Sequence, residues 1–175
     1  RIDPGAVHLR DGRTIRAGTI VWAAGVRANP LTDLLGVELG RGGRIVVAAD
    51  LSVPTHPDVF AIGDIAIDPA DPLPQVAQPA IQGGHHVARQ IVRRLDGLPT
   101  EPFRYHDKGS MATIGRHHAV AEFPRGLRLH GPIGWLAWLG LHIVYLMGFR
   151  NRANVLVNWA WNYVTYDRAS RMIAG

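Results

Sequence analysis

Val-Phe-Ala-Ile-Gly-Asp, residues 59–64, is the stretch of sequence on which the predicted fold depends. Its four consecutive apolar residues predict a strand buried on both faces, and a glycine and a carboxylate follow at once. In open α/β sheets, ligands bind just beyond the carboxyl ends of the strands. Gly63 would let a ligand approach the backbone, and Asp64 would offer an acceptor to a ligand hydroxyl. An ordinary turn after a buried strand is the alternative.

The composition indicates a folded protein and narrows the chemistry open to it. The chain has 175 residues, of which 47% are hydrophobic, so it can bury a core. It contains no cysteine, which excludes a disulfide framework, a thiol nucleophile and a cysteine-ligated metal. The net charge of +5 comes almost wholly from arginine, because Lys108 is the only lysine. Attraction to an anionic membrane explains this charge at least as well as nucleic acid does, and no specific nucleic-acid partner is expected.

The segment before residue 59 is expected to be rich in strands. Alternation on both sides of Asp11-Gly12 predicts a β-hairpin with a two-residue turn. The apolar run Thr19–Gly25 predicts a buried strand whose small terminal residues would let a ligand approach. The other expected elements are a short helix at Leu31–Leu35, a turn at Gly40–Gly43, a strand at Ile45–Val47 and a loop framed by Pro54 and Pro57.

A helix is expected after the proline-rich loop that follows Asp64. It begins near Gln78 and Pro79, and Asp96-Gly97 ends it. Because the helix starts soon after Asp64, its amino terminus can return to the same edge of the sheet. Unpaired N–H groups and a partial positive charge there favour an anion, or a ring that becomes anionic on reduction. The expected apolar side of the helix consists of Ala80, Gly84, Val87, Ala88, Ile91 and Leu95.

Three further strands are expected before the last third of the chain. They are Phe103–Tyr105, Met111–Ile114 and His118–Ala121. With the preceding elements they predict an α/β domain that ends near residue 125.

The last third is rich in tryptophan and apolar residues. Gly131–Phe149 contains one titratable residue, His142, and as a single helix it would span roughly 28 Å, barely the hydrocarbon thickness of a bilayer. Arg150-Asn151-Arg152 would close it. Val155–Tyr166 then interleaves apolar residues with asparagines, and Arg168 and Arg171 follow. This pattern is typical of membrane interfaces, so residues 126–175 are predicted to anchor the protein on a membrane surface. Buried helices, a dimer interface and a true span are the alternatives.

The histidine pairs His85-His86 and His117-His118 do not predict a metal site. Adjacent residues point about 100° apart on a helix and to opposite faces on a strand, so neither pair chelates readily. We expect these histidines at the surface or behind a ligand site. Gly40–Gly43 precedes a strand rather than a helix, so it is not a phosphate-binding loop.

Taken in order, five stretches of the sequence resemble the type II NADH dehydrogenases, single-subunit NADH:quinone oxidoreductases that do not pump protons. The stretches are residues 19–29, 43–47, 59–64, 77–83 and 107–115. The Ala-Gln and Asp-Lys-Gly motifs and the aromatic tail separate this family from other two-dinucleotide-binding flavoproteins. The resemblance implies an α/β fold, with part of an FAD/NAD(P)-binding Rossmann-like domain over residues 1–125. An amphipathic, membrane-anchoring helical tail would occupy residues 126–175.

The resemblance also implies how FAD is held. Asp64 would bind its ribityl chain, while Gly63 and Gly25 give backbone clearance. Ala77 would lie at the isoalloxazine ring, and Lys108 matches a family lysine near the flavin.

The implied reaction passes a hydride from NADH to the flavin, which then reduces a quinone. Gln78 would lie at the isoalloxazine ring, and with Gln82 it would border the quinone pocket. The family resemblance further implies a peripheral location on the cytoplasmic face of the cell membrane and a possible homodimer.

The chain departs from the family pattern at its start. Neither the Gly-x-Gly-x-x-Gly motif for FAD nor the second one for NADH is present, and both would belong upstream of Arg1. We therefore expect a carboxyl-terminal fragment that neither binds NADH nor turns over alone. Two alternatives are another FAD-dependent pyridine-nucleotide oxidoreductase, of the ferredoxin- or disulfide-reductase type, and a non-enzymatic basic membrane-binding module. The absence of cysteine argues against the sulfide-oxidising relatives.

Overall fold

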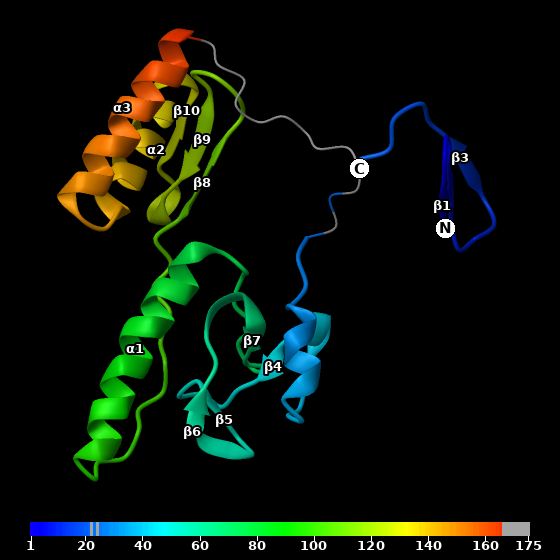
Figure 1. Ribbon diagram of the computed structural model, residues 1–175. Coiled ribbons are helices and arrows are strands. Elements are labelled where there is room, and N and C mark those ends of the chain that lie inside the picture. Colours follow the sequence, from blue (N-terminus) through cyan, green and yellow to red (C-terminus); the bar gives the residue numbers. More distant parts are fainter. Residues whose placement is uncertain (22, 24, 166–175) are drawn as a thin grey trace. The chain divides into compact units, whose positions relative to one another are not determined.

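The computed structural model describes residues 1–21, 23 and 25–165. The chain divides into two compact units, residues 1–105 (unit 1) and residues 106–175 (unit 2) (Figure 1). The boundary expected after residue 125 falls inside unit 2. Each unit is described by itself.

Unit 1 begins with a three-stranded antiparallel sheet. Its strands are β1 (Ile2–Asp3), β2 (Ala6–His8) and β3 (Thr14–Arg16). The predicted hairpin is confirmed, with Val7 opposite Ile15. Its loop is one residue longer than expected, because the Leu9 N–H donates to the Arg13 carbonyl at 2.9 Å. Gly12 takes the left-handed conformation, with φ at +85°, that closes a loop of this length.

The strand predicted at Thr19–Gly25 is absent. Trp22 and Ala24 lie outside the described residues, and those described between 19 and 25 form no strand. The Val21 side chain is 82% exposed. A strand needs a neighbour for its backbone N–H and C=O groups, and no described segment pairs with this one. Of the described residues of this run, Ile20 is half-buried and the others are exposed.

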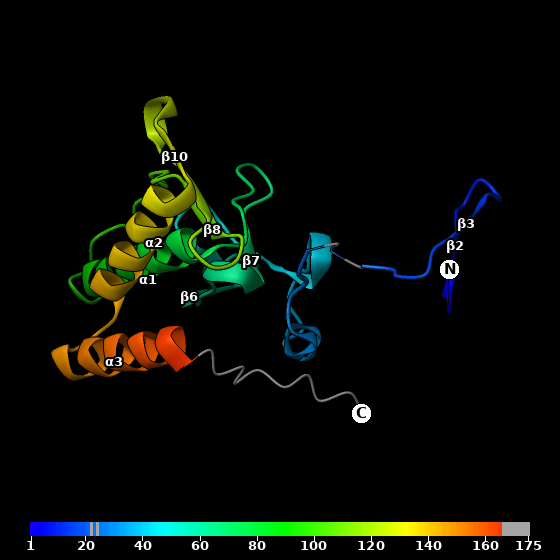
Figure 2. The ribbon, with the colours of Figure 1, turned by 90° about the horizontal axis from the view of Figure 1, so that it is seen from above.

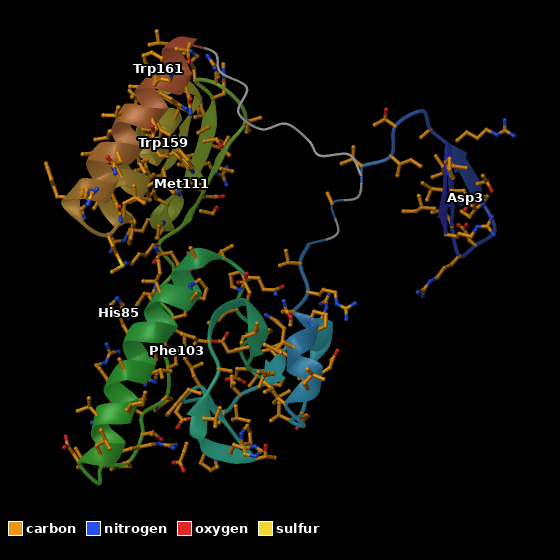
Figure 3. All side chains as sticks on the ribbon, viewed as in Figure 1. Asp3, His85, Phe103, Met111, Trp159 and Trp161 are labelled. Atoms are coloured by element: carbon orange, nitrogen blue, oxygen red, sulfur yellow. The ribbon has the colours of Figure 1, made fainter. Side chains whose placement is uncertain are left out.

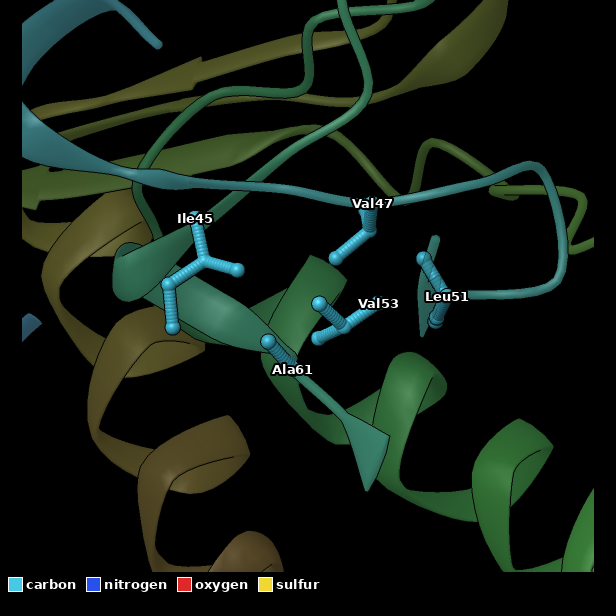
Figure 4. Close-up of a cluster of buried hydrophobic side chains, with 5 residues drawn as sticks. All are labelled: Ile45, Val47, Leu51, Val53 and Ala61. Atoms are coloured by element: carbon cyan, nitrogen blue, oxygen red, sulfur yellow. The ribbon is translucent and has the colours of Figure 1, made fainter. Parts of the chain in front are cut away.

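The core of unit 1 lies among two small sheets and a long helix. One sheet is parallel, β4 (Ile45–Val46) with β7 (Ala66–Ile67), and the other is antiparallel, β5 (Ser52–Val53) with β6 (His56–Phe60). Two 3-10 helices, η1 (Pro30–Leu34) and η2 (Arg41–Gly43), match the short helix and turn predicted there. The buried cluster consists of Ile45, Val47, Leu51, Val53 and Ala61 (Figure 4).

The stretch at residues 59–64 differs from its prediction. β6 ends at Phe60 and pairs antiparallel with β5, and Pro57 lies within β6 rather than in a loop. The Val59 side chain is 52% exposed, whereas Ala61 is 4% exposed and belongs to the core. The run is therefore not a strand buried on both faces, because a two-stranded hairpin covers only part of its surface.

The predicted helix is confirmed as α1 (Ala77–Leu95), but its buried face includes only part of the predicted apolar side, of which Val87 packs against the core. The buried residues of α1 are Pro79, Gly83, His86 and Gln90. Ile91 and Leu95, expected on the apolar side, are 46% and 81% exposed. A Cβ on Gly83 would lie 3.4–3.5 Å from side-chain atoms of Ile62 and Leu51, so this part of α1 packs directly on the core.

Unit 2 is a three-stranded antiparallel sheet covered by helices. The strands are β8 (Ser110–Thr113), β9 (Ala119–Glu122) and β10 (Arg128–His130), in the order β10-β9-β8. β8 and β9 confirm two predicted strands, and β10 was not predicted. Helix α2 (Gly131–Tyr145) packs on this sheet, and α3 (Phe149–Thr165) packs on α2 (Figures 1 and 2). The strand predicted at Phe103–Tyr105 is absent, because the Phe103 N–H donates to the Ala49 carbonyl at 2.7 Å and its side chain joins the core of unit 1.

The helix predicted over Gly131–Phe149 is two helices in the structure. α2 ends at Tyr145, and Arg150-Asn151-Arg152 lie in the first turn of α3 rather than closing α2. Arg152 nevertheless caps α2, because its guanidinium donates to the carbonyls of Leu146 and Val144, each at 2.8 Å. Among the described residues, no helix has the length and apolar character needed to cross a bilayer. Tyr166, Arg168 and Arg171 lie outside the described residues.

Candidate functional site

The candidate site is the place where the Gly63-Asp64 turn meets the start of α1. These residues begin the 3-10 turn η3 (Gly63–Ile65), which packs against α1. Gly63 has a φ of +70°, and a Cβ there would lie 3.1 Å from the Cβ of Ala80. A side chain at Gly63 would therefore be strained and would push the turn away from the helix.

Asp64 presents its carboxylate to solvent at this turn. The residue is exposed, and within the described part of the chain no donor reaches its side-chain oxygens. Its backbone carbonyl accepts a hydrogen bond from Gln75 Nε2 at 2.9 Å, which ties the turn to the loop before α1. The carboxylate is thus held in place by its backbone and remains available as an acceptor.

The amino terminus of α1 supplies donors beside the turn. Its N-cap residue, Val76, makes no side-chain capping bond, so the first backbone N–H groups lack the partner that a polar cap provides. Ala77 is exposed and Gln78 is half-buried. The Gln82 side chain donates from Nε2 to Gln78 Oε1 at 3.3 Å, which orients the Gln78 amide. The arrangement combines an acceptor carboxylate, oriented amides and the positive end of a helix dipole.

No contact of Gly25 or Lys108 with the described residues supports the cofactor roles expected for them. Gly25 has a φ of +82° in an exposed segment, with open space where a Cβ would be. Lys108 belongs to unit 2, and its Nζ donates to the Tyr145 hydroxyl at 3.4 Å. The roles expected for these two residues remain predictions.

A buried polar pair further along α1 was missed by the sequence interpretation. His86 and Gln90 are 5% and 1% exposed, and Gln90 Oε1 accepts the Glu101 N–H at 2.8 Å. Of the two positions expected for these histidines, at the surface or behind a ligand site, His86 does not occupy the first, whereas His85 is exposed. The four-residue spacing of Gln78, Gln82, His86 and Gln90 is the sequence signal that could have revealed this polar line.

Burial lowers the pKa of His86, although a hydrogen bond involving the Glu101 backbone opposes that effect. Its ring lies 5.3 Å from that of Phe103, and its Nε2 has no hydrogen-bond partner in the part of the chain that the structure describes. No group of three or more potential metal ligands occurs among the described residues.

Two family models match the chain, one on each unit. The pyridine nucleotide-disulphide oxidoreductase model matches residues 2–84, and the NDH2 C-terminal domain model matches residues 107–166.

Relatives similar to nearly the whole chain include two proteins of Mycobacterium tuberculosis. The type II NADH:quinone oxidoreductase NdhA is 42% identical over 95% of the chain, and the type II NADH:quinone oxidoreductase Ndh is 39% identical over 98%. The chain spans only 37% and 39% of the lengths of these two relatives.

Among solved structures, NDH2 from Plasmodium falciparum in complex with NADH shares the fold. Its TM-score is 0.67 at 16% identity, over 86% of this chain and 46% of that chain.

Proposed function

This chain belongs to the type II NADH:quinone oxidoreductase family, and we propose that it forms the carboxyl-terminal part of an enzyme that carries electrons from NADH through FAD to a membrane quinone without pumping protons. The observation that carries this proposal is the order of the two family matches along the chain. The first contains the Gly63-Asp64 turn beside α1, and the second contains the aromatic helices of unit 2.

The residues at the Gly63-Asp64 turn fit part of an FAD site. When bound, FAD takes a hydride from NADH and passes electrons to the quinone. The solvent-facing Asp64 carboxylate would accept a hydrogen bond from a ribityl hydroxyl. Gly63 would leave the backbone open to the cofactor, a role that we also assign to Gly25. The positive end of α1, at Ala77, would stabilise negative charge on a reduced ring.

The two glutamines of α1 are the proposed quinone-binding groups. Their amides can donate hydrogen bonds to quinone carbonyl oxygens, and the Gln82–Gln78 hydrogen bond fixes the orientation of the pair. The family resemblance adds Lys108 as a cation near the flavin. It also suggests a second copy of the chain as a partner.

Unit 2 is the proposed attachment to the cytoplasmic face of the membrane. Its helices and the loop between them expose large apolar side chains, among them Ile133, Leu136, Val144, Met147, Phe149, Val157, Trp161 and Val164, each at least 60% exposed. Exposed apolar and aromatic side chains on short helices suit a peripheral location in the interface.

Replacing Asp64 tests the cofactor assignment. In the full-length protein, Asp64→Asn should lower flavin occupancy, measured as the ratio of flavin absorbance to protein concentration. Asp33→Asn, a change of the same kind on the exposed surface of η1, should leave the ratio as in the wild type. Equal flavin occupancy in all three proteins would remove Asp64 from the site.

Replacing Gln78 tests the quinone assignment. Gln78→Leu should slow reoxidation of the reduced flavin by quinone in stopped-flow measurements while NADH still reduces the flavin at the normal rate. His85→Leu, at an exposed position of the same helix, is the matched control. If reoxidation by quinone is equally fast in Gln78→Leu and wild type, the assignment fails.

A further inference from the structure

Unit 2 contains an apolar groove that the proposed electron transfer does not use. Its volume is about 570 Å³, and α2, α3 and the end of β8 with its following turn form its walls. Six of the residues that line it are Trp135, Trp138, Leu139, Leu156, Trp159 and Tyr163. Since an apolar cavity of about 150 Å³ holds benzene, this groove has room for a chain of roughly a dozen or more carbon atoms.

Two indole rings form one wall of the groove. Trp138 of α2 and Trp159 of α3 stack with ring centroids 5.9 Å apart and an angle of 26° between their planes. Both side chains are half-buried, whereas Trp161, two residues further along α3, is 66% exposed (Figure 3). A surface of this kind binds hydrocarbon and offers little to a polar ligand.

The turn between β8 and β9 places a cation at the edge of the groove. The Arg116 guanidinium lies over the Tyr163 ring, 5.5 Å from its centroid, and donates to the Tyr163 and Asn162 carbonyls at 3.3 and 3.4 Å. His117 follows with a φ of +62°, and its ring contacts the Tyr163 hydroxyl. A non-glycine residue in the left-handed region is strained, and the surrounding contacts hold it there.

The net positive charge of the chain comes from the unit that contains this groove. Residues 106–175 include eight basic and three acidic side chains, which accounts for the whole net charge of +5. Residues 1–105 include eleven of each and are neutral overall. Of the described residues that line the groove, Arg116 alone is charged. The expected occupant therefore combines a long apolar chain with a negative group.

We infer that this groove binds one acyl chain of an anionic phospholipid, with the headgroup phosphate against Arg116. Arginine and phosphate form charge-assisted hydrogen bonds, and Trp138 and Trp159 line the path of the chain. A quinone carries a long apolar tail but no charge, so it does not match the cation at the edge. This inference rests on the proposed membrane attachment and adds to it a discrete lipid site.

Native mass spectrometry tests the inference. The flavin-loaded, full-length protein is placed in nanodiscs of mixed phosphatidylglycerol and phosphatidylcholine, and the lipids that it retains on release are identified. The wild type should retain one phosphatidylglycerol per chain and no phosphatidylcholine. Ala160→Phe fills the groove and Arg116→Gln removes the cation, so each should lower the retained lipid at least tenfold. Asn158→Phe, on the same helix, and Arg125→Gln introduce the same side chains at exposed positions outside the groove and should retain the lipid.

Four outcomes would overturn the inference. They are retention of phosphatidylcholine as strongly as phosphatidylglycerol, retention of lipid by Ala160→Phe, equal losses in Arg116→Gln and Arg125→Gln, and release of quinone instead of phospholipid. Flotation on phosphatidylglycerol vesicles separates this inference from the proposed membrane attachment. A wild type that floats but retains no lipid would leave the attachment intact and exclude the site. A wild type that does not float would refute the attachment itself.

Discussion

Gly134 is the residue on which the packing of α2 against its sheet depends. It is the one buried residue of α2, and a Cβ there would lie 2.8 Å from the Ala119 carbonyl oxygen and 3.2 Å from that of Leu129. Both oxygens belong to sheet backbone, so they cannot swing away as the end of a side chain would. Gly134→Ala must therefore displace the helix from the sheet. Overpacking of this kind costs about 1–3 kcal/mol.

The same helix provides a control for the gain in helix propensity. Gly140 has no atom within 4 Å of a built Cβ, so Gly140→Ala should stabilise the protein by up to about 1 kcal/mol. Gly134→Ala gains the same amount from propensity and loses the overpacking energy, which leaves a net destabilisation of about 0–2 kcal/mol. The difference between the two variants isolates the contact and should be about 1–3 kcal/mol.

Thermal unfolding and hydrogen exchange measure this difference. For a unit of this size, 1 kcal/mol shifts the midpoint by about 4–8 °C, so Gly140→Ala should unfold several degrees above Gly134→Ala. The backbone amides of β9 and α2 should exchange faster in Gly134→Ala than in the control. If Gly134→Ala is as stable as Gly140→Ala, the close approach of α2 to the sheet is not what the structure indicates.

Three other predictions concern single contacts. Burial lowers the pKa of His86 from its ordinary value of 6.5, so below that pH the unfolded state binds more protons than the folded state. The free energy of unfolding should therefore fall as the pH drops below about 6.5. His86→Gln should flatten that part of the stability–pH curve, and an unchanged slope would contradict this. Arg152→Ala leaves two carbonyls at the end of α2 without their donor, so it should lower the free energy of unfolding in urea by about 1–2 kcal/mol. Arg150→Ala, at an exposed position in the same turn, should lower it by less than about 0.5 kcal/mol. Gly63→Ala places a side chain on a left-handed backbone, 3.1 Å from Ala80, so it should lower the free energy of unfolding by about 1–3 kcal/mol. It should also lower flavin occupancy in the full-length protein. Full occupancy would show that the turn tolerates a side chain.

The elements predicted correctly are those whose signals are local. α1 begins beside Pro79 and ends before Gly97, and both residues act through their own backbone geometry. Strands β8 and β9 were also predicted, each within one residue of its observed bounds. Such signals depend on neighbours in the sequence, which the sequence displays directly.

The wrong predictions concern burial and pairing. Thr19–Gly25 has the composition of a buried strand, yet no described segment pairs with it. Val59 was expected inside, but the β5–β6 hairpin leaves it half exposed. The break between α2 and α3 was missed as well, although Gly148, with a φ of +80°, lies at that break.

The candidate site shows the same division. The sequence suggested Gly63, Asp64 and Gln78 as candidate residues, because a glycine and a carboxylate after an apolar run and a glutamine at a helix start can be recognised from the sequence. The sequence did not show that His86 is buried, since that depends on which face of α1 packs against unit 1. It also did not show that Arg116 meets the aromatic groove.

The sequence by itself determined the family, the position of α1 and, at the end of the stretch 59–64, the Gly63-Asp64 turn that leads to it. It could do so because these follow from motif order and local backbone preference. Only the tertiary structure decided that this stretch ends an exposed hairpin, that a polar face of α1 is buried, and that Trp138 stacks on Trp159 beside a cation. Each of these depends on contacts between segments that are distant in sequence. The free energy of such contacts is not determined by a local sequence pattern.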